Sequence, residues 1–265
     1  NAREMGIEIL PPSVNSSEWD FTAEYLEDGK TAIRFGFGAI KNVGQGPVDA
    51  LIAAREGKDF NDINKFIHEV DLRAIGKRSL ESMVKVGALD VFGDRSSLIA
   101  SLDQIIAVSG SHFKAKDAGQ ISMFGAATGV SNEIHLMPGD EIDQRIQLGW
   151  ERELIGIYVS DHPLSGYQKT FKQIRTHTAS TLPDARHEQR VRVAGIIAGV
   201  RPYQTKSGKP MGFVTLDDMH GIIEMVIFPR TWQDYRELCE EGTIVVVSGK
   251  ADAANTPPKI LVDHI

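Results

Sequence analysis

The chain has 265 residues, of which 42% are hydrophobic and 25% are charged, and this length and composition predict a soluble protein with two folded domains. It has no apolar run near the roughly 20 residues that span a membrane, no signal peptide, and a single cysteine, Cys239, which excludes an intrachain disulfide and a thiolate metal cluster. The net charge of −7 disfavours unselective nucleic-acid binding, and the sequence as a whole predicts a cytoplasmic protein without membrane contact.

Residues 1–33 form a short acidic segment without a core of its own. A strand is predicted over residues 6–10, ended by the pair Pro11 and Pro12, and acidic turns follow it. Because so few residues cannot bury a core, we interpret this segment as the end of a larger domain. The chain opens on Asn1 instead of Met, which we interpret as a fragment or a processed chain.

Residues 34–110 are predicted to be helical, within a predicted domain that spans residues 34–116. Apolar residues recur at helical spacing in four stripes, of which the longest contains Leu98, Leu102 and Ile106, and Pro47 suits a first helical position. With 12 basic and 10 acidic side chains, this is the one segment with a positive balance, which favours local contact with phosphate.

A glycine-rich turn precedes the helix predicted from Pro47. Glycines at alternate positions permit a tight turn between two helices and let backbone N–H groups approach a phosphate. This pattern predicts a helix-hairpin-helix, which grips the DNA backbone without reading sequence; an ordinary helical turn with glycine caps is the alternative. The predicted duplex contacts are Lys41, Asn42, Val43, Gly44, Gln45 and Gly46.

A second hairpin is predicted at residues 86–90, between two apolar stripes. Asp90 places a carboxylate near this turn, which would repel phosphate, so we interpret the second copy as mainly structural. Lys77 and Arg78, with Lys85, are predicted peripheral phosphate contacts, and a solvated basic face is the alternative.

Residues 111–149 lack clear periodicity, which is typical of a functional loop or a linker, and we assign that loop to residues 117–149. Between Gly119 and Gly125 the stretch contains one amide, one thioether and one aromatic side chain that could enter a groove of another protein. The alternative is a loop that packs on its own domain. The predicted docking peptide is Gln120, Ile121, Ser122, Met123 and Phe124.

Residues 150–188 are predicted to connect two domains and to contain a short helix that stops before Pro163. Residues 189–265 then change to strand periodicity, with five strands and a helix between the third and the fourth. This order is typical of an OB-fold barrel. The predicted fold class is therefore α+β multidomain, an all-α tandem helix-hairpin-helix domain followed by a β-barrel OB-fold.

The loop after the first predicted barrel strand is basic and flexible. OB-folds bind single strands with such loops and with exposed aromatic rings that stack on bases. The predicted single-strand contacts are Arg201, Tyr203, Lys206, Lys209 and Phe213, with Phe228 as a further aromatic candidate. For Phe213 and Phe228, a place in the barrel core is an equal alternative.

Catalytic interpretations of this chain fail on geometry. Ser160, Asp161 and His162 are consecutive, so they cannot converge as nucleophile, base and orienting group. The Asp217–Asp218 pair is more typical of a turn than of a metal site. We therefore predict no catalytic residue, metal ligand or cofactor within this chain.

The motifs, taken in order, resemble the bacterial DNA polymerase III alpha subunit, the replicative polymerase family, downstream of its catalytic palm. The resemblance covers almost the whole chain and departs at Asp161, where we expect Gly, at Gly212, where we expect Ala, and at Pro47. The segments that carry it are residues 6–15, 33–44, 77–81, 87–90, 150–158 and 162–164.

The resemblance implies an order of parts and a set of partners. It implies the end of the fingers region in residues 1–33, the tandem helix-hairpin-helix domain in 34–116, a loop with the sliding-clamp motif in 117–149, a connecting segment in 150–188 and the OB-fold in 189–265. The expected partners are the beta sliding clamp, double- and single-stranded DNA and other replisome subunits. Gln120, Met123 and Phe124 would enter the clamp's hydrophobic cleft.

The resemblance also implies a nucleotidyltransferase, a DNA-directed DNA polymerase, whose catalytic carboxylates and Mg lie upstream of this fragment. The fragment is then expected to be inactive alone. Three alternatives remain open: a stand-alone clamp-associated DNA-binding adaptor, an RNA-binding OB module of the anticodon-binding type, and an error-prone paralogue of the same polymerase family.

Overall fold

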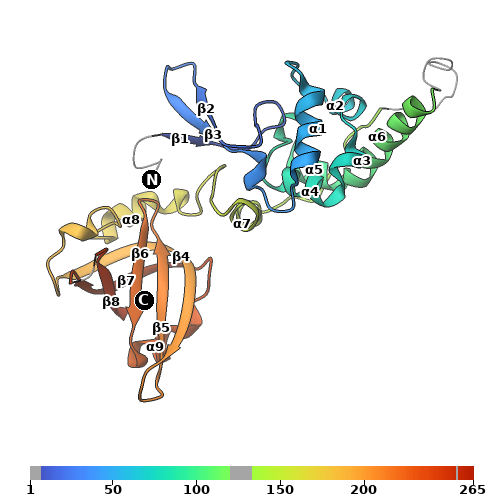
Figure 1. Cartoon of the computed structure of the whole chain (residues 1–265). Helices are drawn as coiled ribbons and strands as arrows, with labels where there is room; N and C mark the ends of the chain where they lie inside the picture. The colour runs from blue at the N-terminus through green and yellow to red at the C-terminus, as the bar shows by residue number, and fades with distance from the viewer. Residues whose placement is uncertain (1–6, 120–132, 255) are drawn as a thin grey trace. The chain divides into compact units, whose positions relative to one another are not determined.

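The computed structural model describes residues 7–119, 133–254 and 256–265, which divide into two compact units, Asn1–Asp161 and His162–Ile265 (Figure 1). The first unit combines a small sheet with helices, and the second is built on a closed five-stranded barrel. The predicted fold class is confirmed. No helix in the described part of the chain is long and apolar enough to cross a membrane.

The first unit begins with a three-stranded sheet of β1 (Glu8–Leu10), β2 (Thr22–Tyr25) and β3 (Thr31–Arg34), in the order β1-β3-β2. β1 runs parallel to β3 and β2 runs antiparallel to it. The segment between β1 and β2 packs on the helices, since Val14 is fully buried and its N–H donates to the Ala88 carbonyl at 2.9 Å. Residues before the helical region therefore contribute to its core.

In the described part of the first unit, seven α-helices surround a core of fully buried side chains such as Phe37, Leu51, Phe66 and Leu89. Aspartates cap four of these helices, since Asp62, Asp71, Asp94 and Asp143 accept a backbone N–H from the first turn. The elements are η1 (Phe37–Ala39), α1 (Gln45–Arg55), α2 (Ile63–Glu69), α3 (Leu72–Ile75), α4 (Lys77–Lys85), η2 (Asp90–Phe92), α5 (Arg95–Ala100), α6 (Leu102–Asp117) and α7 (Gln144–Ile155).

Several predicted element boundaries are wrong. A single-turn 3-10 helix, η1, precedes the first hairpin turn where the prediction places an α-helix, and Pro47 is the third residue of α1 instead of the first. The long apolar stripe is divided between α5 and α6 at Ser101, and α6 continues to Asp117, beyond the predicted end of the helical region at residue 110. The short helix predicted to stop before Pro163 begins at Gln144 and does end before that proline, at Ile155, because Gly156 adopts a left-handed conformation there, with φ at 79°.

The segment before α7 is attached to the helices through backbone groups. Asn64 binds the backbone of Ile134 twice, donating to its carbonyl at 3.1 Å and accepting its N–H at 2.6 Å. The Met137 N–H donates to the Ser101 hydroxyl at 2.8 Å. A Cβ on Gly139 would lie 2.2 Å from the Ser96 carbonyl oxygen, so glycine is required at this close approach.

The second unit places five strands and a helix in the predicted order. The closed barrel has the strand order β4-β5-β6-β8-β7, in which only the β6–β8 pair is parallel. Its elements are η4 (Ser165–Tyr167), α8 (Gln168–Ile174), η5 (Leu182–Asp184), β4 (Arg190–Gln204), β5 (Pro210–Asp217), β6 (Ile222–Ile227), α9 (Pro229–Tyr235), η6 (Arg236–Leu238), β7 (Ile244–Asp252) and β8 (Lys259–His264).

The indole ring of Trp232 on α9 lies against the backbone of Gly212 on β5. A Cβ added at Gly212 would lie 2.0 Å from the ring, so the ring occupies the space that an alanine methyl needs. We expect Gly212→Ala to lower the free energy of unfolding by about 1–3 kcal/mol, the usual range for overpacking. Urea denaturation followed by far-UV circular dichroism measures this change, also in variants that lack Trp232.

Gly199→Ala in β4 is the matched control, since its new Cβ would meet Thr215 at an ordinary 3.8 Å. Combining Gly212→Ala with Trp232→Leu should recover part of the loss, because the smaller side chain makes room for the methyl group. Equal stability of the two glycine variants would contradict this account of Gly212.

Candidate nucleic-acid interface

The turn before α1 is anchored on two other helices of the first unit. The Lys41 N–H donates to the Leu154 carbonyl of α7 at 2.9 Å. Asn42 donates from its amide nitrogen Nδ2 to Ser82 Oγ at 3.2 Å, and its carbonyl accepts from Ser79 Oγ at 2.7 Å. Both serines belong to α4, so the turn lies beside the first turns of that helix.

The left-handed residue of this turn is Asn42, with φ at 69°, and not one of the glycines. Gly44 is extended, with φ at −95°, and Gly46 lies within α1, so the predicted steric reason for the glycines is wrong. A Cβ on Gly46 would meet no atom within 4 Å. The glycines instead leave open space beside an exposed backbone.

The predicted duplex contacts come from two segments, residues 41–46 and residues 77–78. The structure brings these segments to one region, because the turn at Asn42 is hydrogen-bonded to α4, which begins at Lys77. Lys41, Lys77 and Arg78 are exposed. Lys77 Nζ pairs with Asp103 at 2.6 Å, a solvent-exposed pair that contributes little and can exchange for a phosphate. Within the described ranges, no carboxylate oxygen lies within 4 Å of the cationic groups of Lys41 or Arg78.

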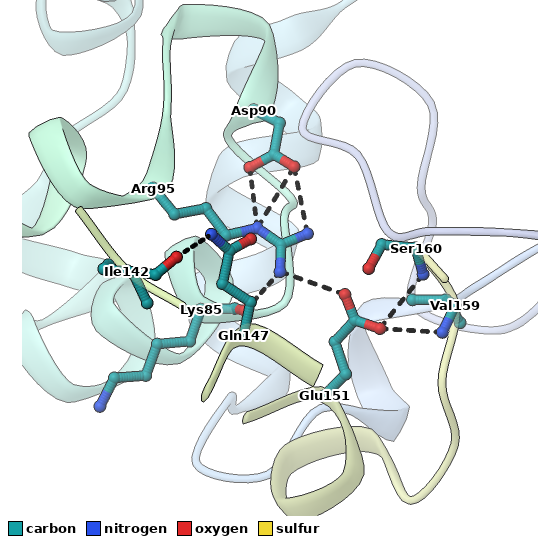
Figure 2. Close-up of polar contacts among 8 residues, drawn as sticks. All are labelled: Lys85, Asp90, Arg95, Ile142, Gln147, Glu151, Val159 and Ser160. Atoms are coloured by element: carbon teal, nitrogen blue, oxygen red, sulfur yellow. Dashed lines mark hydrogen bonds and ion pairs between the residues drawn. The ribbon is translucent and has the colours of Figure 1, made fainter. Parts of the chain in front are cut away.

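A buried ion pair holds α7, which carries the Leu154 carbonyl, against the second hairpin (Figure 2). Arg95 Nη1 lies 3.1 Å from Glu151 Oε1, and the Arg95 and Glu151 side chains are 6% and 0% exposed. The other Glu151 oxygen accepts the N–H groups of Val159 and Ser160 at 2.9 and 3.1 Å. Every charged atom of this pair therefore has a partner, which is the condition for a buried pair to be tolerated.

The second hairpin is shaped around the same arginine. Arg95 Nη2 lies 3.2 Å from Asp90 Oδ2, so the Asp90 charge is opposed inside the protein, which weakens the predicted repulsion of phosphate. Gly87, with φ at 84°, leaves room for this guanidinium, since a Cβ there would lie 2.3 Å from Arg95 Nη2. Arg95 therefore lies at the centre of the second hairpin, where it binds Asp90 and the Lys85 carbonyl.

Three of the predicted single-strand contacts gather on the outside of the barrel. Arg201 on β4 lies opposite Phe213 on β5, with its guanidinium carbon 4.8 Å from the ring centroid. The Tyr203 ring meets Phe213 edge-on, with centroids 5.8 Å apart, and is 52% exposed. A groove of about 490 Å³ borders Arg201 and Phe213. Phe213 is thus not part of the barrel core.

The other two predicted contacts lie at the tip of the hairpin between β4 and β5. Lys206 and Lys209 are both exposed. The tip is closed by hydrogen bonds from the Thr205 N–H to the Lys209 carbonyl and from the Gly208 N–H to the Thr205 carbonyl, at 2.9 and 2.8 Å. Phe228, the further aromatic candidate, is 48% exposed beside α9. Gln120, Ile121, Ser122, Met123 and Phe124 lie outside the described residues.

The candidate catalytic groups have structural roles. Burial raises the pKa of the Asp218 carboxyl, which accepts the N–H groups of Ala179 and His220 and so fixes a turn. Burial also raises the pKa of the Cys239 thiol, which disfavours the reactive thiolate. Over the described ranges, no group of three or more potential metal ligands gathers.

Sequence reasoning missed the Arg95–Glu151 pair. Glu151 lies three residues from both Leu148 and Leu154, so it occupies the buried face of α7. A carboxylate at an apolar helix position is a sequence signal for a buried partner. The identity of that partner has no local signal, because Arg95 is 56 residues away.

Two family models match the parts of the chain that contain these sites. Residues 6–98 match the model described as a helix-hairpin-helix motif, and residues 191–265 match an OB-fold nucleic acid binding domain. The first match includes the turn at Asn42 and the start of α4, and the second includes the barrel except for its first residue, Arg190.

Curated relatives match nearly all of the chain. The proteins named DNA polymerase III subunit alpha from Vibrio cholerae and Haemophilus influenzae are each 34% identical, over 255 and 250 residues; these matches cover 94% and 93% of this chain and 21% of each relative. That of Mycobacterium tuberculosis is 34% identical over 260 residues, covering 94% of this chain and 22% of the relative. The chain thus spans about a fifth of the length of these relatives, and the resemblance seen in the sequence is confirmed.

Proposed function

The chain is a homologue of part of the DNA polymerase III alpha subunit, and on that premise we propose that it binds DNA during replication. The helix-hairpin-helix region binds the backbone of duplex DNA, and the barrel binds a single strand. The observation that supports the duplex site best is the meeting of the exposed Asn42 turn with the start of α4.

The duplex site suits binding to the DNA backbone, because the groups it offers are positive charges and backbone N–H groups, which contact phosphates. Lys41 and Arg78 have no carboxylate within 4 Å in the described part of the chain, so a phosphate oxygen would be a new partner for each. The start of α4 adds backbone N–H groups. Contacts of this kind position the protein on the duplex and carry little sequence information.

The barrel site combines one cation with two rings. Tyr203 offers a half-exposed ring on which a base can stack, while Arg201 covers Phe213 and remains able to contact a phosphate. Lys206 and Lys209 extend this positive surface along the hairpin. A single strand is the form of nucleic acid that such rings favour, since its bases are unpaired.

Two further parts of the proposal depend on sequence and homology alone. Residues Gln120–Phe124 bind the sliding clamp, which would keep a polymerase at the primer end by raising its effective concentration there. The nucleotide transfer of the longer relatives, with Mg, is carried out by residues outside this chain, so a primer-extension assay of the chain alone is expected to yield no product.

The duplex part is tested by Lys41→Ala with Arg78→Ala. We expect weaker binding to all duplex sequences alike, and a plot of log K against log salt that is shallower by about 2, since each lost phosphate contact removes about one unit. Fluorescence anisotropy with two unrelated duplexes over a salt series measures both effects.

Lys58→Ala with Lys65→Ala is the matched control, because it removes the same charge from exposed positions elsewhere in the first unit. Both pairs should lose affinity equally if only net charge matters, and that result would remove the Asn42 turn from the proposed site. A loss confined to one of the two duplexes would argue against backbone recognition.

A further inference from the structure

A pocket of about 810 Å³ lies on the barrel between β4, β7, β8 and α9, and we call it the β4/β7 pocket. Four basic side chains line it, two from β4, one from α9 and one from β7: Arg190, Arg192, Arg230 and Lys250. Two carboxylates, Asp234 and Asp263, line it as well, so these six side chains leave a positive balance. The pocket includes none of the predicted single-strand contacts.

Strand register places two of the cations directly against each other. Val191 and Val193 are buried in the barrel, so Arg190 and Arg192 point outward from β4. Arg190 pairs with Lys250 across the antiparallel β4–β7 ladder. Like charges opposite each other destabilise a sheet, so this arrangement has a cost in the absence of a bound anion.

The protein itself supplies little neutralisation at this pocket. Counting only residues 7–119, 133–254 and 256–265, no carboxylate oxygen lies within 4 Å of the four cationic groups. Arg192 Nε donates to Ser248 Oγ at 3.4 Å, a long hydrogen bond without charge. The guanidinium groups thus retain most of their donors, which suit the paired oxygens of a phosphate.

The size and the remaining lining favour a chain of phosphates over a single ion. The volume lies in the range of small-molecule sites and exceeds what one phosphate fills. Thr231 and Ser248 add hydroxyl groups, the kind of group that contacts sugar and phosphate, whereas the Thr176 hydroxyl is engaged with the Arg192 backbone. Tyr235 and His264 add two rings, with centroids 6.4 Å apart, where a base could lie.

We propose that the β4/β7 pocket binds backbone phosphates of a single-stranded nucleic acid, as a second contact point of the barrel. Strand β4 connects this pocket to the proposed single-strand site at Arg201 and Tyr203. Arg192 of the pocket and Arg201 lie on that same strand, separated by up to ~30 Å at about 3.3 Å per residue. Barrels of this kind bind about 4–16 nucleotides, so one strand could reach both points. The inference rests on the proposed single-strand binding of the barrel.

The test compares two charge-matched variants of the full chain. Arg190→Gln with Lys250→Gln removes the facing cations, and Lys169→Gln with Arg236→Gln removes the same charge from exposed positions outside the pocket. With an oligo-dT of about 16 nucleotides, we expect the pocket variant to bind at least tenfold more weakly than the control. The slope of log K against log salt concentration should be shallower by about 1.4 for the pocket variant, because two phosphate contacts are lost and each contributes ~0.7 on a single strand. An oligo-dT of about 4 nucleotides, which fills only the Tyr203 face, should bind both variants alike.

Equal affinity of the two variants for the long oligonucleotide would overturn the inference. Tighter binding of polyglutamate than of oligo-dT to the wild-type chain would overturn it as well, because the pocket would then favour carboxylates over phosphates. Titration calorimetry with inorganic pyrophosphate distinguishes failure of the phosphate site in the pocket from failure of the proposed single-strand binding. If the wild type binds no oligonucleotide yet binds pyrophosphate, and the pocket variant does not, the proposed function fails and the phosphate site stands. If the wild type binds neither, both fail.

Discussion

Glu151→Ala is expected to lower the free energy of unfolding of the first unit by about 3–5 kcal/mol, the usual effect of removing one partner of a buried ion pair. The Arg95 guanidinium, 6% exposed, would lose the Glu151 carboxylate and keep only Asp90 and the Lys85 carbonyl. The N–H groups of Val159 and Ser160 would lose their acceptor as well. Chemical denaturation followed by circular dichroism measures the loss.

Glu153→Ala is the matched control, because Glu153 is an exposed glutamate on the same helix. Glu151→Gln should fall between the two, since an amide oxygen still accepts hydrogen bonds but carries no charge. A loss below about 1 kcal/mol for Glu151→Ala would show that Arg95 finds other partners, against the expectation for a broken buried pair.

Met123→Ala with Phe124→Ala is expected to abolish binding to the sliding clamp. Burial of one large apolar side chain contributes about 1.5–3 kcal/mol, so loss of both side chains should weaken binding by a factor of about a hundred or more. Titration of the chain with purified clamp, followed by calorimetry, measures the dissociation constant.

Ser122→Ala is the control within the same peptide, because the serine is expected only to span between the anchors. Its dissociation constant should stay near that of the wild type, and the circular dichroism spectra of all variants should be identical. An unchanged dissociation constant for the double variant would remove the peptide from the proposed clamp site and leave the two DNA sites untouched.

The order of elements was readable from local patterns except in the first segment, where acidic turns were predicted and the strands β2 and β3 form. Strand periodicity and the place of α9 between the third and fourth barrel strands predicted the OB-fold, and the stripes of apolar residues predicted a helical region before it. These patterns succeed because a strand or helix that buries one face must repeat apolar residues at its own period. The side chains of the two proposed DNA sites were named on the same local basis.

The sequence by itself determined most of the succession of helices and strands, the glycine-rich turn and the family resemblance. Each of these features depends on residues that are close together along the chain. Only the tertiary structure decided that Arg95 pairs with Glu151, that Trp232 fills the space beside Gly212, and that Arg190 faces Lys250. Each of these contacts joins residues at least 20 positions apart along the chain. Such contacts depend on how whole elements pack, and no local period encodes which distant side chain completes a buried charge or a filled cavity.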